Sequence, residues 1–83
     1  MTAAQIAERI ERSIPGARAE VSGDEAHFSA VVVCDAFQGK TRVEQHQMIY
    51  ALFRKEMTDQ TIHALALRTL TSQQEGGGRA PAS

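Results

Sequence analysis

The stretch His27-Phe28-Ser29-Ala30-Val31-Val32-Val33-Cys34 decides how this chain folds. It is rich in β-branched residues, and apolar side chains occupy both its odd and its even positions. This pattern is typical of a strand that is central in its sheet and covered on both faces. We therefore expect this segment to be the middle strand, beside which the other elements are placed.

The residues before this strand predict a helix and a hairpin partner. Thr2-Ala3-Ala4-Gln5 has the form of a capping box, and apolar residues follow it at helical spacing. Pro15-Gly16 ends the helix, because proline cannot continue the hydrogen-bond ladder. Apolar and charged residues then alternate over residues 17–21, which is the period of a half-buried strand. Residues 22–25 form a tight turn into the central strand.

The residues after the central strand predict a second helix and a third strand. Residues 37–40 read as a turn, and Thr41-Arg42-Val43-Glu44 is a second capping box that opens a helix ending at about Met57. After a short polar break, residues 62–70 form the last strand. The buried stripe of the second helix is expected to consist of Met48, Ile49, Leu52, Phe53 and Met57.

The element order is therefore helix, strand, strand, helix, strand. Strands joined by a tight turn pair antiparallel, whereas a helical crossover makes the third strand parallel to the second. We expect an α+β fold with a three-stranded mixed sheet and both helices packed on one face. The ordered domain should span residues 1–71. Residues 72–83 are polar and glycine-rich, so we expect a disordered C-terminal tail.

Length and composition restrict the function further. The 83 residues make one small domain, and the formal charge of −1 does not direct the whole protein to nucleic acid or to anionic membranes. The sequence has no apolar run near the roughly 20 residues that cross a bilayer, and its start lacks a secretory pattern. The single Cys34 cannot form an internal disulfide. We expect a cytoplasmic protein with no membrane association.

The sequence does not indicate an enzyme. No serine or cysteine nucleophile can be placed beside a plausible base and an orienting acid. Asp24-Glu25 is the acidic pair of a turn rather than an acid–base couple. We expect no catalytic residues.

A cationic group lies between Phe37 and Lys55, where a single acidic residue, Glu44, accompanies four basic ones. Beside a helix N-terminus such a group could bind phosphates of DNA, although a solvated helix end is the favoured explanation. The segment around Gly39 has one glycine rather than the Gly-x-x-Gly loop of KH domains. The four candidate nucleic-acid-binding residues are Lys40, Arg42, Arg54 and Lys55.

Five segments of the chain resemble the BolA family: residues 21–24, 27–28, 33–40, 42–50 and 62–71. The resemblance implies a fold similar to the class II KH domain. It also implies partnership with a monothiol glutaredoxin, with which a glutathione-ligated [2Fe–2S] cluster is shared. A second implied activity is DNA-binding regulation of morphology and stress genes. The cationic group could equally dock an acidic face of the glutaredoxin.

The resemblance also implies a cluster ligand, His63, in the segment Ile62-His63-Ala64-Leu65. Imidazole is a competent donor to iron, although a histidine at a strand mouth can also simply bond a loop carbonyl. Family members supply a second ligand from the loop between the first two strands, but residues 22–26 contain no histidine or cysteine. His27 is the nearest candidate. Because parallel neighbours lie about 4.8 Å apart, both rings could meet at one metal, or His27 could face solvent.

Two other residues are set aside. Cys34 lies roughly 23 Å along the strand from His27, so we expect a small buried hydrophobe there. His46 is expected to be a half-exposed helix histidine. With two imidazoles as its only plausible ligands, the isolated protein should be a monomer without a cluster, and the glutaredoxin complex a heterodimer.

Overall fold

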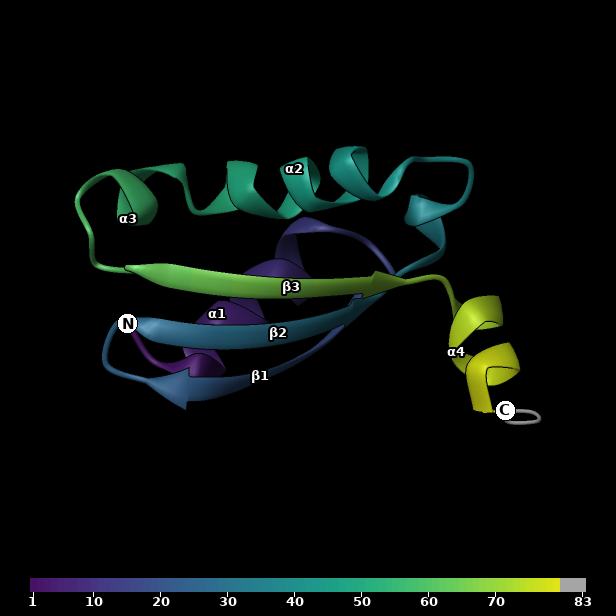
Figure 1. Ribbon diagram of the computed structural model, residues 1–83, viewed down its shortest axis with the longest axis horizontal. Coiled ribbons are helices and arrows are strands. Elements are labelled where there is room, and N and C mark those ends of the chain that lie inside the picture. The colour runs from purple at the N-terminus through teal and green to yellow at the C-terminus, as the bar shows by residue number, and fades with distance from the viewer. Residues whose placement is uncertain (80–83) are drawn as a thin grey trace.

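The computed structural model describes residues 1–79. They form a three-stranded sheet with helices packed against it (Figure 1). Two capping boxes start the helices as the sequence indicates, at Thr2 and at Thr41. In chain order the elements are α1 (Ala3–Ser13), β1 (Arg18–Asp24), β2 (His27–Val33), the 3-10 helix η1 (Asp35–Phe37), α2 (Arg42–Leu52), α3 (Arg54–Thr58), β3 (Ala64–Leu70) and α4 (Ser72–Arg79).

The sheet has the order β1-β2-β3, with β1 antiparallel and β3 parallel to β2. This mixed sheet confirms the predicted fold class and the central place of β2. One core joins the sheet to α1 and α2. It contains Ile6 and Ile10 of α1, Ile49 of α2, Phe53 directly after α2, and Phe28 and Val32 of β2. All of these core side chains are buried, so α1 and α2 share one face of the sheet.

The opposite face of β2 is largely open, so the expectation of cover on both faces is wrong. Buried and exposed residues alternate from His27 to Val32, and Val31 keeps 36% of its surface exposed. This face is open because α1 and the crossover helix α2 pack on the same side of the sheet. The remaining C-terminal helix, α4, lies beyond the end of β3 and does not cover the open face (Figure 1).

The second helix is shorter than predicted. It ends at Leu52, and the five residues of α3 follow after Phe53, whose φ of −122° and ψ of 22° break the helix. Of the predicted stripe, Ile49 and Phe53 are fully buried, whereas Met48, Leu52 and Met57 pack at the margin of the core. The last strand begins at Ala64 rather than at Ile62, because residues 59–63 form a turn.

The predicted disordered tail differs from the structure, in which residues 72–79 form α4. Thr71 and Gln74 explain the helix: the Thr71 Oγ1 accepts from the Gln74 amide at 3.1 Å, and the Gln74 Oε1 accepts from the Thr71 amide at 2.8 Å. This is a third capping box, and Thr71-Ser72-Gln73-Gln74 carries its sequence signal. The rest of the predicted tail, residues 80–83, lies outside the described residues.

Candidate functional site

Two exposed histidines meet at the end of the sheet where β2 and β3 begin. The ring centroids of His27 and His63 lie 5.1 Å apart, with 51° between the ring planes. The parallel register explains this, since Ala64 is the partner of His27, and the amides of His63 and Ala64 both donate to the Ala26 carbonyl, at 2.7 and 3.0 Å. The predicted proximity of the two rings is confirmed, whereas their role as ligands stays a prediction.

The His63 ring is oriented by the turn that precedes it. Its Nδ1 donates to the Gln60 Oε1 at 3.0 Å, and Gln60 adopts a left-handed φ of 69°. Asp59 holds the same turn by accepting from the Thr61 amide at 2.9 Å. In the neutral tautomer that carries its proton on Nδ1, the lone pair of Nε2 is free, which is the arrangement of a metal-binding histidine with its second ring nitrogen fixed.

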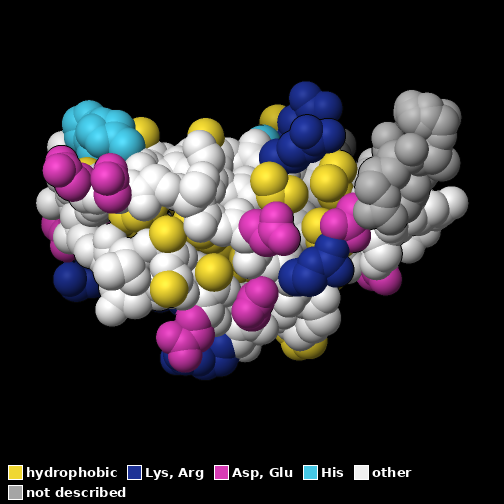
Figure 2. Space-filling model, turned by 90° about the horizontal axis from the view of Figure 1, so that it is seen from below, with side chains coloured by type: hydrophobic (Ala, Val, Ile, Leu, Met, Phe, Trp, Pro, Cys, Tyr) yellow, Lys and Arg dark blue, Asp and Glu magenta, His cyan; other side chains and the backbone are white. Residues whose placement is uncertain are grey.

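The β1–β2 turn fixes His27. Gly23 has a φ of 114°, and a Cβ at that position would stand 2.3 Å from the His27 carbonyl oxygen. The backbone of the hairpin can approach this closely only because Gly23 has no side chain. Acidic side chains lie beside the histidines on this corner of the molecule (Figure 2), where Asp24 is the cross-strand partner of His27.

The donor set of the site consists of two imidazoles. Within residues 1–79, no group of three or more His, Cys, Asp or Glu side chains could hold a metal ion. A [2Fe–2S] cluster needs four ligands, of which two can be imidazoles on one iron. Cys34 does not complete the set, because it lies buried at the other end of β2, where its Sγ accepts from the Ala36 amide. Its prediction as a small buried hydrophobe is confirmed.

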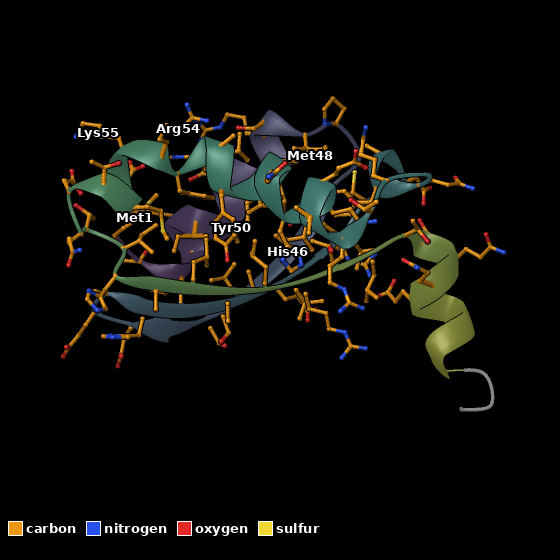
Figure 3. The ribbon with its side chains drawn as sticks, turned by 45° about the horizontal axis from the view of Figure 1, so that its top comes forward. Met1, His46, Met48, Tyr50, Arg54 and Lys55 are labelled. Carbon is orange, nitrogen blue, oxygen red and sulfur yellow. The ribbon has the colours of Figure 1, made fainter. Side chains whose placement is uncertain are left out.

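The four predicted nucleic-acid-binding residues lie in two groups along the helices, and their role stays a prediction. Arg42 begins α2, whereas Arg54 and Lys55 lie beyond its end, so the helical rise separates the two groups by roughly 18 Å. Figure 3 shows Arg54 and Lys55 together at one end and His46 farther along α2. Lys55 also forms an ion pair with Asp59 at 3.5 Å. The helix itself divides the predicted patch.

Arg42 has a different cationic neighbour, Arg68, which sequence reasoning missed. A hollow of about 500 Å³ lies between the first turns of α2 and the end of β3. It is lined by Arg42, His46, Leu67, Arg68, Thr69 and Leu70. Arg68 is the single charged residue of β3, and this was the signal in the sequence that could have indicated it. His46 is half-buried as expected, with its ring edge-on to Tyr50 at 6.5 Å.

Comparison with known proteins identifies the family. A sequence model of the family BolA, described as BolA-like protein, matches residues 6–74. The chain belongs to the BolA family. This BolA-family chain is similar in structure to a bolA protein homologue from Coxiella burnetii, with a TM-score of 0.81 and 34% identity. The similarity covers 92% of this chain and 97% of that one.

Two curated relatives carry functional names. The DNA-binding transcriptional regulator BolA of Escherichia coli is 41% identical over 68% of this chain. The acid stress protein IbaG of the same organism is 35% identical over 61% of this chain. The matches cover only 52% and 61% of those two proteins. Within residues 1–79 of this BolA-family chain, no helix is long and apolar enough to cross a membrane.

Proposed function

We propose that this BolA-family protein is the partner of a monothiol glutaredoxin and shares a glutathione-ligated [2Fe–2S] cluster with it. Its role would be iron–sulfur cluster trafficking or iron regulation in the cytoplasm, without catalysis by this chain. One observation carries the proposal: His27 and His63 lie 5.1 Å apart at an exposed end of the sheet. Two imidazoles offered together to solvent suit a metal centre that a second protein completes.

Each side of the pair has a defined task. His63 offers its Nε2 to iron, and Gln60 holds the ring through Nδ1. His27 offers the second imidazole from the first residue of β2. The partner and glutathione supply the thiolates, which the two described histidines cannot replace. When bound, the cluster supplies one-electron and iron–sulfur transfer chemistry.

The α3 side of the site carries two cations that an acidic partner can meet, whereas Asp24 makes the hairpin side acidic. Arg54 and Lys55 of α3 lie at the same end of the molecule as the starts of β2 and β3 (Figure 1). Both side chains are exposed, so they can meet carboxylates of a docking protein. Such complementary charges mainly raise the association rate and fix the orientation of the partners.

Co-expression with a monothiol glutaredoxin tests the proposal. We expect the isolated chain to purify colourless and monomeric, and the co-purified complex to be a heterodimer with the visible absorption of a [2Fe–2S] cluster. The control is the glutaredoxin with glutathione alone, whose visible spectrum the BolA-family chain should change by adding an imidazole ligand. Absence of a complex by size exclusion after anaerobic reconstitution would contradict the proposal.

DNA binding is the second candidate, favoured by the name of the regulator that shares 41% identity with this chain. The four cations lie in two groups roughly 18 Å apart, so one DNA duplex could meet Lys40 with Arg42, Arg54 with Lys55, or both groups. If two phosphates are neutralised, a plot of log binding constant against log salt concentration should have a slope of roughly −1.8. If four are neutralised, the slope should be roughly −3.6. Two double variants test the groups: Lys40→Ala with Arg42→Ala, and Arg54→Ala with Lys55→Ala. These residues do not bind DNA if the affinity is independent of salt, or if neither double variant lowers it.

A further inference from the structure

The hollow between α2 and β3 is a second site, distinct from the histidine pair. It lies where α2 begins and β3 ends, whereas His27 and His63 lie where β3 begins. At about 3.3 Å per strand residue, His63 and Arg68 are separated by roughly 16 Å. On the open face, basic side chains stand at the upper edge, well away from the large histidine patch (Figure 2).

The two arginines of the hollow lack acidic partners. Arg9, Arg12 and Arg18 pair with Glu56, Glu8 and Glu75. Neither Arg42 nor Arg68 has an ion pair or a side-chain hydrogen bond with any residue that the structure describes. No residue lining the hollow is acidic. Two guanidinium groups beside one cavity, with no carboxylate to neutralise them, favour an anionic ligand.

The remaining lining offers one more polar group and an apolar surface. His46 projects from α2 toward β3 (Figure 3), and its Nε2 is buried without a hydrogen-bond partner among the described residues. An unpaired buried ring nitrogen costs stability unless something satisfies it. Leu67 and Leu70 supply apolar surface to the same hollow. The hollow therefore combines cationic and apolar groups in its lining.

We propose that this hollow binds a phosphate ester. The guanidinium groups of Arg42 and Arg68 take the phosphate oxygens, because their forked donors match phosphate geometry. The organic part of the ester lies against Leu67 and Leu70. A volume of about 500 Å³ is within the range of small-ligand sites and suits one nucleotide, either free or as a residue of a single strand. The proposal does not depend on the cluster-binding role.

NMR titration of the full ¹⁵N-labelled chain tests the site. The probes are inorganic phosphate, adenosine 5′-monophosphate and a single-stranded oligodeoxynucleotide. We expect saturable shifts at residues 42, 46 and 67–70, with tighter binding of the nucleotide than of inorganic phosphate. Saturation by the oligonucleotide alone would support a phosphodiester chain as the ligand. Equal affinity for phosphate and nucleotide would overturn the apolar subsite, and saturation by none of the probes would overturn the site itself.

Variants separate this site from diffuse electrostatic attraction. Arg42→Gln and Arg68→Gln should each weaken the binding of the tightest probe about tenfold or more, since each removes a charged hydrogen bond. Arg12→Gln is the control: its side chain lies on α1, outside both candidate sites, and the change should alter affinity less than about twofold. His46→Phe keeps the ring against Tyr50 but removes both nitrogens, and should also weaken binding. If Arg12→Gln weakens binding as much as Arg68→Gln, the attraction is general and the site is wrong.

Discussion

Arg9 of α1 holds Glu56 of α3 in a two-pronged ion pair. Its Nη1 and Nη2 lie 2.9 and 3.0 Å from the two carboxylate oxygens. The same guanidinium donates to the Leu52 carbonyl at 3.0 Å and stands over the Phe53 ring at 5.0 Å. The side-chain hydrogen bond from Arg9 holds the pKa of Glu56 below its ordinary value. One side chain thus ties the N-terminal helix to the break between α2 and α3.

Arg9→Ala should lower the free energy of unfolding by about 1–2 kcal/mol, because it removes a charged hydrogen-bond pair and leaves the Leu52 carbonyl without its donor. The free energy of unfolding of Arg9→Lys should lie between those of the unchanged protein and Arg9→Ala, since lysine keeps the charge but lacks the forked guanidinium. Arg12→Ala is the control: its pair with Glu8 is 71% and 69% exposed, so the change should stay within about 0.5 kcal/mol. Urea denaturation measures all three, and equal losses for Arg9→Ala and Arg12→Ala would contradict the clamp.

Docking of α4 should depend on pH through Asp35. Its Oδ1 accepts from the Ser72 hydroxyl at 2.7 Å and from the Ser72 amide at 3.0 Å. These bonds lower the pKa of Asp35 below its ordinary value of 3.8. For a lowered pKa, the stabilisation is complete above the ordinary value and is lost as the pH falls through the folded-state pKa. Hydrogen exchange at residues 72–75 should therefore accelerate as the pH falls below 3.8, after correction for the intrinsic rate.

Asp35→Asn is the variant that checks this account. It removes the charge, so the corrected exchange of residues 72–75 should be faster than in the unchanged protein at neutral pH and should respond less to acid. An unchanged pH response in Asp35→Asn would assign the effect to another carboxylate.

Gly23→Ala should destabilise the hairpin that carries His27. The new Cβ would meet the His27 oxygen at 2.3 Å and the Phe28 Cα at 2.9 Å, with a φ of 114°. We expect a loss of more than about 2 kcal/mol, since strain and overlap add. Gly39→Ala is the matched control: its φ is 81° but nothing lies within 4 Å of the new Cβ, so only about 1 kcal/mol should be lost. Thermal unfolding compares them, and equal losses would exclude the close approach as the cause.

His63→Ala should spare the fold while changing the cluster complex. The side chain is exposed, so we expect a stability cost near 1 kcal/mol. The visible spectrum and lifetime of the cluster in the glutaredoxin complex should change, because an imidazole ligand is lost. His27→Ala should do the same if His27 replaces the missing loop ligand, and His46→Ala should leave the spectrum unchanged. If the cluster in the His63→Ala complex has the same spectrum and lifetime as with the unchanged protein, His63 is a structural residue and not a ligand.

Gln60→Ala separates ring orientation from ligation. It removes the oxygen that bonds the His63 Nδ1 at 3.0 Å but keeps both imidazoles. Loss of such a supporting bond typically weakens a metal site about 10- to 100-fold. The complex should therefore form with a similar spectrum but lose its cluster faster. A cluster lifetime unchanged by Gln60→Ala would show that the turn does not orient the ligand.

Local signals in the sequence were enough to predict the order of helices and strands and the proximity of His27 to His63. A capping box reports on residues within one turn, as at Thr2 and Thr41. The parallel pairing of β2 and β3 then follows from a helical crossover, which brings both strand starts to one end. The third capping box, at Thr71, has an equally clear sequence motif, but the polar and glycine-rich residues that follow it led to the prediction of disorder.

By itself, the sequence determined the α+β order, the mixed sheet and the histidine pair, because these depend on periodicity, turns and crossover direction. Only the tertiary structure decided which cations stand together. The axis of α2 separates Arg42 from Arg54, and the packing of α2 on β3 brings Arg42 to Arg68. It also decided that the helix breaks at Phe53, where Arg9 covers a buried ring. Contacts between residues far apart in the chain depend on how whole elements pack, and no local pattern encodes that.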